Sequence, residues 1–245
     1  MRNIFKIHPM TYIMLLIALL TGHFKEITIF MIIILVHELG HILAGLLLKW
    51  QIKKVVILPF GGITIFKAIL NKPLIEEFII AIMGLLFQLL FTLICPTVLI
   101  KNYSLIILLI NLIPIYPLDG SKILSVFLNK VFPFKLSHKL TNYLSLFLAM
   151  FLLFFFFLKH ELIYILFITL IIIKLKDEFT NHNLIYEKFL YERYIYNLKF
   201  KKIKIIKNIN QFYKDHYHFI KNNTLIEEVD ILRVKYTSNG AKEVL

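Results

Sequence analysis

Two histidines and a glutamate stand at the spacing that zinc-dependent hydrolases use. Residues 34–45 read ILVHELGHILAG, which places His37 and His41 four residues apart. On a helix these two positions lie on one face, one turn apart, so both imidazoles can reach a single metal ion. Glu38 lies about 100° around the helix, at the edge of that face. There it can accept a proton from metal-bound water, so the motif predicts a zinc site with Glu38 as the catalytic residue.

The surroundings of this motif argue against a chance match or two histidines that merely pack in a helix bundle. Residues 27–48 form an apolar run, and His37 and His41 are the only two of the nine histidines that fall well inside such a run. A charged side chain in the middle of a membrane span costs at least about 2.5–3.5 kcal/mol, and such residues usually mark a functional interior. A role in chemistry is therefore the favoured interpretation.

A catalytic zinc site needs three protein ligands, and we expect the third to be Asp119. It lies in residues 111–120, which read NLIPIYPLDG. Of the six acidic residues in the first 173, only Glu38 and Asp119 lie away from loops and span edges. Two prolines interrupt the helix and Gly120 permits a sharp bend, so the carboxylate can turn toward the histidine helix. The alternative role for Asp119 is a simple N-cap for a helix over residues 120–130.

Long apolar runs place these residues in a membrane. Of the 245 residues, 59% are hydrophobic and only 18% are charged, which is too little charge to cover a soluble domain. We predict an all-α membrane protein with six transmembrane helices and a short re-entrant β-hairpin. A tight turn at Lys101 and Asn102 is expected to join the third span to the fourth. The six predicted spans are residues 9–21, 27–48, 74–100, 103–118, 141–158 and 161–173.

The distribution of lysines predicts the orientation in the membrane. The 28 basic and 15 acidic residues give a net charge of +13, but in the first 173 residues the lysines fall between apolar runs rather than in a stripe. Membrane flanks therefore explain them better than a nucleic-acid surface, and we expect no direct nucleic-acid contact. The lysine-rich loops alternate with lysine-poor ones. This pattern puts both termini in the cytoplasm and the histidines and Asp119 toward the cytoplasmic leaflet of the bilayer.

A change in composition near residue 174 predicts two domains. Residues 1–173 would form the membrane domain, and residues 174–245 a small cytoplasmic α/β domain, with a helix over 181–197 and a strand within 199–207. The single cysteine, Cys95, lies in an apolar run and can form neither an internal disulfide nor a metal cluster.

The two motifs together resemble those of the site-2 protease family, the intramembrane zinc metalloproteases of peptidase family M50. HELGH is similar to the zinc-binding helix of that family, and residues 111–120 match its N-x-x-P-x-x-P-L-D-G pattern. The resemblance implies one zinc ion per chain. It also implies the following roles: His37, His41 and Asp119 as zinc ligands, Glu38 as general acid and base, and Asn111, Pro117 and the hairpin glycines Gly61 and Gly62 at the substrate.

Several features resemble the sporulation branch of the family, whose members process the inactive precursor of a sigma factor. These features are six spans, no PDZ insertion, and the segment 186–194 after the last span. The resemblance implies a membrane-associated protein substrate of the pro-sigma type and inhibitory membrane partner proteins. Residues 199–232 match at most half of the CBS domain with which such members often end. The sequence leaves open whether the chain forms a homo-oligomer.

Three alternatives also stay open. The same chemistry can act on an anti-sigma factor or a signal-peptide remnant. The chain can instead be a non-catalytic membrane protein that holds or transports zinc. Residues 57–66 are either an exposed strand edge to which an extended substrate adds or simply a turn between helices.

Overall fold

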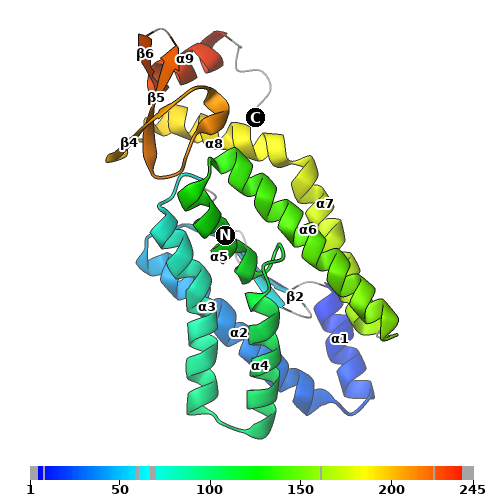
Figure 1. The fold of residues 1–245 in the computed structure, drawn as a ribbon. Coiled ribbons are helices and arrows are strands. Elements are labelled where there is room, and N and C mark those ends of the chain that lie inside the picture. Colours follow the sequence, from blue (N-terminus) through cyan, green and yellow to red (C-terminus); the bar gives the residue numbers. More distant parts are fainter. Residues whose placement is uncertain are drawn as a thin grey trace. The chain divides into compact units, whose positions relative to one another are not determined.

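The computed structural model describes residues 5–7, 9–58, 61–66, 70–160, 162–222 and 224–238. Helices make up most of the chain, and two small sheets accompany them (Figure 1). The chain divides into two compact units. The first comprises residues 1–68, 76–113 and 118–120, and the second comprises residues 69–75, 114–117 and 121–245.

The first unit combines apolar helices with a three-stranded sheet. The sheet has the order β1-β2-β3, in which β1 runs parallel to β2 and β2 runs antiparallel to β3. The predicted hairpin is therefore present as β2 and β3, although its tip, Pro59 and Phe60, lies outside the described residues. The elements of this unit are β1 (Phe5–Ile7), α1 (Pro9–Leu20), α2 (Phe24–Leu47), β2 (Ile52–Leu58), β3 (Gly61–Phe66), α3 (Leu74–Ile94) and α4 (Val98–Leu112).

Helix α2 has the inverse polarity of a helix in a soluble protein. Its polar residues His37, Glu38 and His41 are buried, together with a stripe of small and branched apolar residues on the same side. Leucines at positions 35, 39, 43 and 46 face outward and are exposed. In water this arrangement would be unfavourable. A hydrocarbon environment accepts the leucines and leaves the polar face to the protein interior.

The turn between α3 and α4 differs from the prediction. We expected it at Lys101 and Asn102, but α3 ends at Ile94 and both of these residues lie inside α4. Pro96 has no amide hydrogen to continue α3, and the Thr97 hydroxyl accepts a hydrogen bond from the Ile100 amide as the N-cap of α4. Local backbone chemistry therefore outweighs the lysine as the sign of a turn. Helix α4 also ends at residue 112, before the two prolines, instead of reaching residue 118 as predicted.

The second unit contains the remaining helices and a second sheet, of order β4-β5-β6. Helices α6 and α7 pack side by side, and α8 and α9 pack against each other. Aromatic and aliphatic side chains, among them Phe134, Phe189 and Phe212, form the main core of this unit. Its elements are α5 (Asp119–Val131), which begins in the first unit, α6 (Phe134–Leu158), α7 (Leu162–Thr180), α8 (His182–Tyr196), β4 (Lys202–Ile206), η1 (Ile209–Gln211), β5 (His216–Asn222), β6 (Thr224–Glu227) and α9 (Glu228–Ser238).

A buried ion pair connects α8 to α9. Arg193 Nη1 lies 3.2 Å from Glu228 Oε2, and neither side chain reaches solvent appreciably. Burial lowers the pKa of Arg193, and the nearby Glu228 carboxylate opposes that shift. The same carboxylate oxygen lies 2.8 Å from His218 Nδ1 on β5. This network joins the sheet to both helices, so the predicted α/β character of the tail is present.

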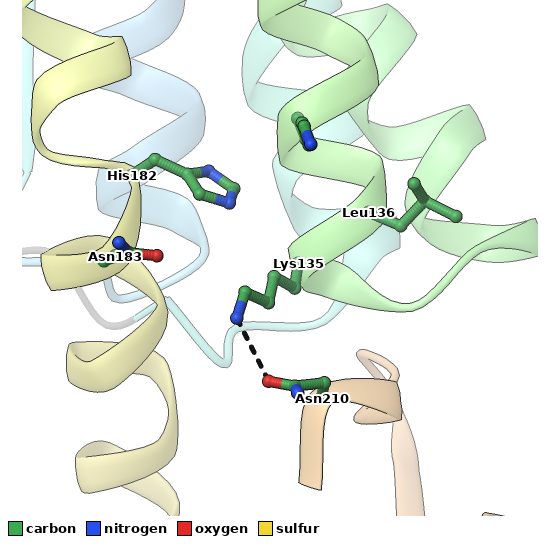
Figure 2. Close-up of a pocket in the computed structure, with 6 residues that line it drawn as sticks. Lys135, Leu136, His182, Asn183 and Asn210 are labelled. Carbon is green, nitrogen blue, oxygen red and sulfur yellow. Dashed lines mark hydrogen bonds between the residues drawn. The ribbon is translucent and has the colours of Figure 1, made fainter. Parts of the chain in front are cut away.

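An open pocket near the start of α6 in the same unit is lined mostly by residues with polar side chains (Figure 2). Lys135 donates to Asn210 Oδ1 at 3.1 Å, and His182 and Asn183 approach from α8. His138 Nδ1 lies 2.7 Å from His182 Nδ1, and its Nε2 lies 2.9 Å from Glu178 Oε1. One of the two Nδ1 atoms must therefore donate a hydrogen bond to the other.

A helix stands at each of the six predicted span positions. Three of them, α2, α3 and α6, are long and apolar enough to cross a membrane by length and composition, and α4 is a shorter apolar helix. The count of six spans stays a prediction. The predicted domain boundary at residue 173 falls inside α7, which continues to Thr180. The division into a membrane domain and a cytoplasmic domain is likewise still a prediction.

Candidate metal centre

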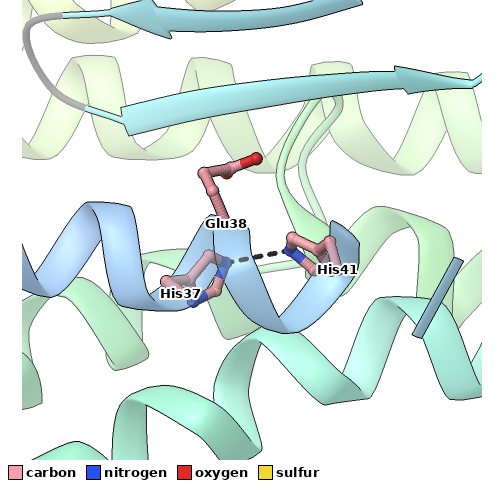
Figure 3. Close-up of side chains that lie close together, drawn as sticks. All are labelled: His37, Glu38 and His41. Carbon is pink, nitrogen blue, oxygen red and sulfur yellow. Dashed lines mark hydrogen bonds between the residues drawn. The ribbon is translucent and has the colours of Figure 1, made fainter. Parts of the chain in front are cut away.

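Helix α2 directs two imidazole rings at each other across one helical turn. The Nε2 atoms of His37 and His41 lie 3.1 Å apart, and the rings meet edge to face at an interplanar angle of 81°. Figure 3 shows both rings on one face of the helix, with Glu38 projecting from a neighbouring face toward the strands. This is the geometry expected for residues at i and i+4, and both histidines are buried.

Asp119, at the start of α5, completes a triangle with the two histidines. Its Oδ2 lies 2.9 Å from His37 Nε2 and 3.0 Å from His41 Nε2. The N-cap alternative also places Asp119 at a helix start. A role as metal ligand also requires Asp119 Oδ2 to point toward both imidazoles, and it does. Three side chains from two distant segments thus bring one donor atom each to a common point.

Hydrogen bonds on the far side of each ring determine where the protons lie. His41 Nδ1 is 2.7 Å from the backbone carbonyl oxygen of Ile80, and His37 Nδ1 is 3.0 Å from Gln88 Oε1. Both partners are acceptors, so each Nδ1 must carry the hydrogen. In the neutral rings both Nε2 atoms then present lone pairs, and they face each other and the Asp119 carboxylate.

Three acceptor atoms in mutual contact repel one another unless a proton or a metal ion lies between them. Tetrahedral zinc ligands at about 2.0–2.1 Å from the ion are separated from one another by about 3.3 Å, close to the separations of 2.9–3.1 Å seen here. Two imidazoles and a carboxylate are also a donor set that zinc accepts. The residues therefore fit the metal that the sequence implies.

Glycine on α3 leaves the space for such an ion. A Cβ added at Gly84 would lie 2.5 Å from His41 Nε2 and 2.9 Å from His37 Nε2. A Cβ at Gly40 would meet the backbone oxygen of Met83 at 2.4 Å, so α2 and α3 approach closely at this level. Small residues permit such close helix packing in membranes. The two glycines thus bring α3 next to the histidines without filling the point where their lone pairs meet.

A third glycine supports Asp119. A Cβ at Gly120 would lie 2.3 Å from the backbone oxygen of Leu112 and 2.5 Å from that of Ile113. The start of α5 therefore lies against the end of α4 with no room for a side chain. In the second unit, Ser145 Oγ accepts from the amide of Tyr116 at 3.1 Å and anchors the preceding loop.

Glu38 stands apart from the triangle and next to the sheet. Its Oε2 accepts a hydrogen bond of 2.7 Å from the Thr64 hydroxyl on β3. One oxygen of its carboxylate and the donor atoms of His37 and His41 all lie within 4.8 Å of one another. Glu38 therefore lies beside the two imidazoles and is bonded to the sheet, and its role as the catalytic residue remains a prediction.

Comparisons with known proteins identify the family of this chain. The model of peptidase family M50 matches residues 25–104. Over 204 residues the chain is 35% identical to stage IV sporulation protein FB of Bacillus subtilis (strain 168), a match that covers 77% of this chain and 70% of that protein. The chain belongs to the site-2 protease family, peptidase family M50.

A solved structure shows the same fold. The site-2 protease from Methanocaldococcus jannaschii is similar with a TM-score of 0.55 and 24% identity, over 71% of this chain and 89% of that one. Together with the apolar helices, family membership makes this chain an integral membrane protein of a peptidase family.

The other predicted site residues of this M50 protein are Asn111, Pro117, Gly61 and Gly62, which were expected to contact the substrate. The Asn111 amide donates to the Ile107 carbonyl oxygen in its own helix at 3.0 Å. Pro117 lies in the loop before Asp119. Gly61 and Gly62 begin β3, paired with the end of β2, on the strand that also carries Thr64. Their predicted contact with substrate remains a prediction.

Sequence reasoning missed three residues that contact the centre of this M50 protein: Gln88, Gly84 and Thr64. Gln88 had a usable signal, because it is a polar side chain in the middle of an apolar run. Gly84 and Thr64 had none. A glycine in a membrane helix and a threonine in a strand are common, and only the packing of α3 and β3 against α2 gives them a role.

Proposed function

We propose that this chain is a zinc metalloendopeptidase that hydrolyses a peptide bond within or beside the bilayer. The observation that supports this most directly is the convergence of His37 Nε2, His41 Nε2 and Asp119 Oδ2 within 3.1 Å. With both Nδ1 atoms committed to other acceptors, these three atoms form a cation site. One zinc ion per chain would be held there.

The chemistry divides between the metal and Glu38. When bound by His37, His41 and Asp119, a zinc ion would polarise a carbonyl and would lower the pKa of a water molecule to about 7. Glu38 accepts a proton from the attacking water and then donates it to the leaving amine. The hydrogen bond from Thr64 holds the Glu38 carboxylate on the sheet side of α2 during both steps. His37, His41 and Asp119 act only as ligands.

An extended substrate would add to β3. A helical peptide hides its carbonyl groups in hydrogen bonds, so it must unwind before cleavage. In the described residues β3 pairs only with β2, at one side, and it carries Thr64 next to Glu38. A peptide paired with the other edge would bring its backbone toward the catalytic residues. We propose that Gly61, Gly62, Asn111 and Pro117 contact the substrate.

The substrate we propose is a membrane-associated precursor of a sporulation sigma factor. The similarity to stage IV sporulation protein FB supports this substrate class, and inhibitory membrane partners belong to the same proposal. We also propose six spans, both termini in the cytoplasm, and an active site toward the cytoplasmic leaflet. Residues 1–173 would form the protease domain, and residues 174–245 the cytoplasmic domain. Single-cysteine labelling from each side of the membrane, in a Cys95→Ser background, tests the topology.

Co-expression with a membrane-tethered precursor tests the function. We expect a cleavage product from the wild-type chain, no product with a membrane-permeant zinc chelator, and recovery when zinc is restored. Glu38→Gln should retain zinc and lose cleavage. A purified wild-type chain without stoichiometric zinc, or full cleavage by Glu38→Gln, would overturn the proposal. Zinc without cleavage of any sigma-factor precursor would favour another substrate or a protein that only holds zinc.

A further inference from the structure

The side chain of Gln88 is fully buried in α3, a helix otherwise composed mainly of apolar residues. Its oxygen Oε1 lies 3.0 Å from His37 Nδ1. Its nitrogen Nε2 donates to the Ser104 backbone oxygen at 2.7 Å and lies 3.1 Å from the Ser104 hydroxyl oxygen on α4. All polar atoms of this amide are therefore used, and they connect three helices.

The direction of the amide follows from Ser104. A backbone carbonyl oxygen can only accept, so the amide atom 2.7 Å from it must be the nitrogen. The opposite orientation would place two oxygens in contact there and would face the amide hydrogens toward His37. The oxygen Oε1 is therefore directed at His37 Nδ1, which must donate. Thr92 adds to the anchor, because its hydroxyl oxygen lies 2.6 Å from the hydroxyl oxygen of Ser104.

We propose that Gln88 is a positioning residue that keeps the proton of His37 on Nδ1 and so keeps Nε2 open for the metal. The inference rests on the proposed zinc site. Without an acceptor at this place, a buried Nδ1–H would lose its hydrogen bond. The ring would then favour the other tautomer, with the proton on Nε2, where Asp119 Oδ2 accepts it at 2.9 Å. That internal hydrogen bond would occupy His37 Nε2 and Asp119 Oδ2, which are two of the three atoms proposed to bind the metal.

Only the tautomer of His37 depends on a side chain, and His41 shows the difference. Its Nδ1 donates to the backbone oxygen of Ile80, which no side-chain substitution removes. The tautomer of His41 is thus secured by the helix itself, whereas that of His37 depends on a single side chain from α3. Outer partners of metal-binding histidines commonly act in this way, and their loss typically costs about 10–100-fold in metal affinity.

Zinc affinity of the purified full-length chain tests the proposal, measured by competition with a chromogenic chelator. Gln88→Met keeps the size of the side chain and removes the acceptor, so we expect zinc to bind about 10–100-fold more weakly. Gln88→Glu keeps an acceptor and should bind more tightly than Gln88→Met. Leu86→Ala, at an exposed position of the same helix, is the matched control and should bind as the wild type does.

The visible absorption spectrum of the cobalt-substituted protein supplies a second readout. Cobalt reports ligand geometry, so Gln88→Met should shift or weaken the spectrum and Leu86→Ala should not. Equal zinc affinity and an identical cobalt spectrum in Gln88→Met would overturn the positioning role alone. If Gln88→Met does not fold, a folded Gln88→Glu chain, which keeps the acceptor, that binds zinc far more weakly than the wild type would overturn it. A wild-type chain that binds no zinc would overturn the proposed function as well.

Discussion

His37 Nε2 and Asp119 Oδ2 lie 2.9 Å apart, although 82 residues separate them in the chain. Between them the chain completes α2, crosses the sheet, and forms α3 and α4. Helices α3 and α4 contribute to the contact. The carbonyl oxygen of Ile80 and the amide of Gln88 orient the rings, and the close approach at Gly120 sets the start of α5. The candidate metal centre is therefore a product of helix packing rather than of one motif.

Asp119 should be needed for metal binding, whereas Glu38 should not. In Asp119→Asn a neutral amide replaces the only carboxylate of the triangle, so we expect zinc affinity to fall by more than the about 10–100-fold that an outer partner costs. Metal analysis of the purified chains measures this directly. Glu38→Gln is the matched control and should retain one zinc per chain. Stoichiometric, tightly held zinc in Asp119→Asn would remove Asp119 from the ligand set.

Gly84→Ala should block the metal centre. The new Cβ would lie 2.5 Å from His41 Nε2, closer than nonbonded atoms approach, so an imidazole must leave the common point. We expect the zinc content of the purified chain to drop well below one per chain. Leu86→Ala on the same helix is the control, because its side chain is exposed. A Gly84→Ala chain with wild-type zinc content would show that the centre lies elsewhere.

Thr64→Val should lower turnover without loss of metal. The substitution preserves shape and removes the hydroxyl that donates to Glu38 Oε2 at 2.7 Å. A hydrogen bond to a charged group is worth about 1.5–3 kcal/mol, which corresponds to about a 10–100-fold loss of cleavage rate if the bond positions Glu38 in the transition state. Thr64→Ser keeps the donor and should retain most activity. Equal rates for the valine and serine variants would contradict this role.

Acid should destabilise the region around His182. Burial lowers the pKa of His182, as do the nearby His138, Lys135 and Lys139, while Glu178 raises it. Below a pH of about 6.5 the unfolded chain binds a proton at this ring that the folded chain resists, so the free energy of unfolding decreases as the pH falls from there. Protease resistance in micelles from pH 7.5 to pH 5 measures the effect.

The control for this prediction is His182→Gln. The glutamine does not titrate, so part of the acid-induced loss of protease resistance should disappear in that variant. An identical pH profile for wild type and His182→Gln would mean that the ring does not contribute.

The sequence by itself predicted the candidate metal ligands and the approximate positions of the apolar helices. An HELGH run inside an apolar segment can be satisfied only on a helix with a polar neighbour, and an isolated Asp119 after two prolines could be selected because acidic residues are costly in hydrocarbon. The helices α2 and α6 were therefore predictable to within a few residues at their apolar ends. The turn at Pro96 was misplaced, because a lysine is a weaker signal of a helix end than a missing amide hydrogen.

Tertiary structure alone decided which atoms meet. The three-residue β1 pairs with β2 although it is too short to show a pattern, and the roles of Gly84 and Thr64 exist only because α3 and β3 lie against α2. The directions of the hydrogen bonds could not be predicted from the sequence either. The tautomer of His37 depends on the orientation of the Gln88 amide, which in turn is set by the backbone oxygen of Ser104. Periodicity and composition report the environment of a residue. Its partners in space are set by packing between segments far apart in the chain, which neither signal encodes.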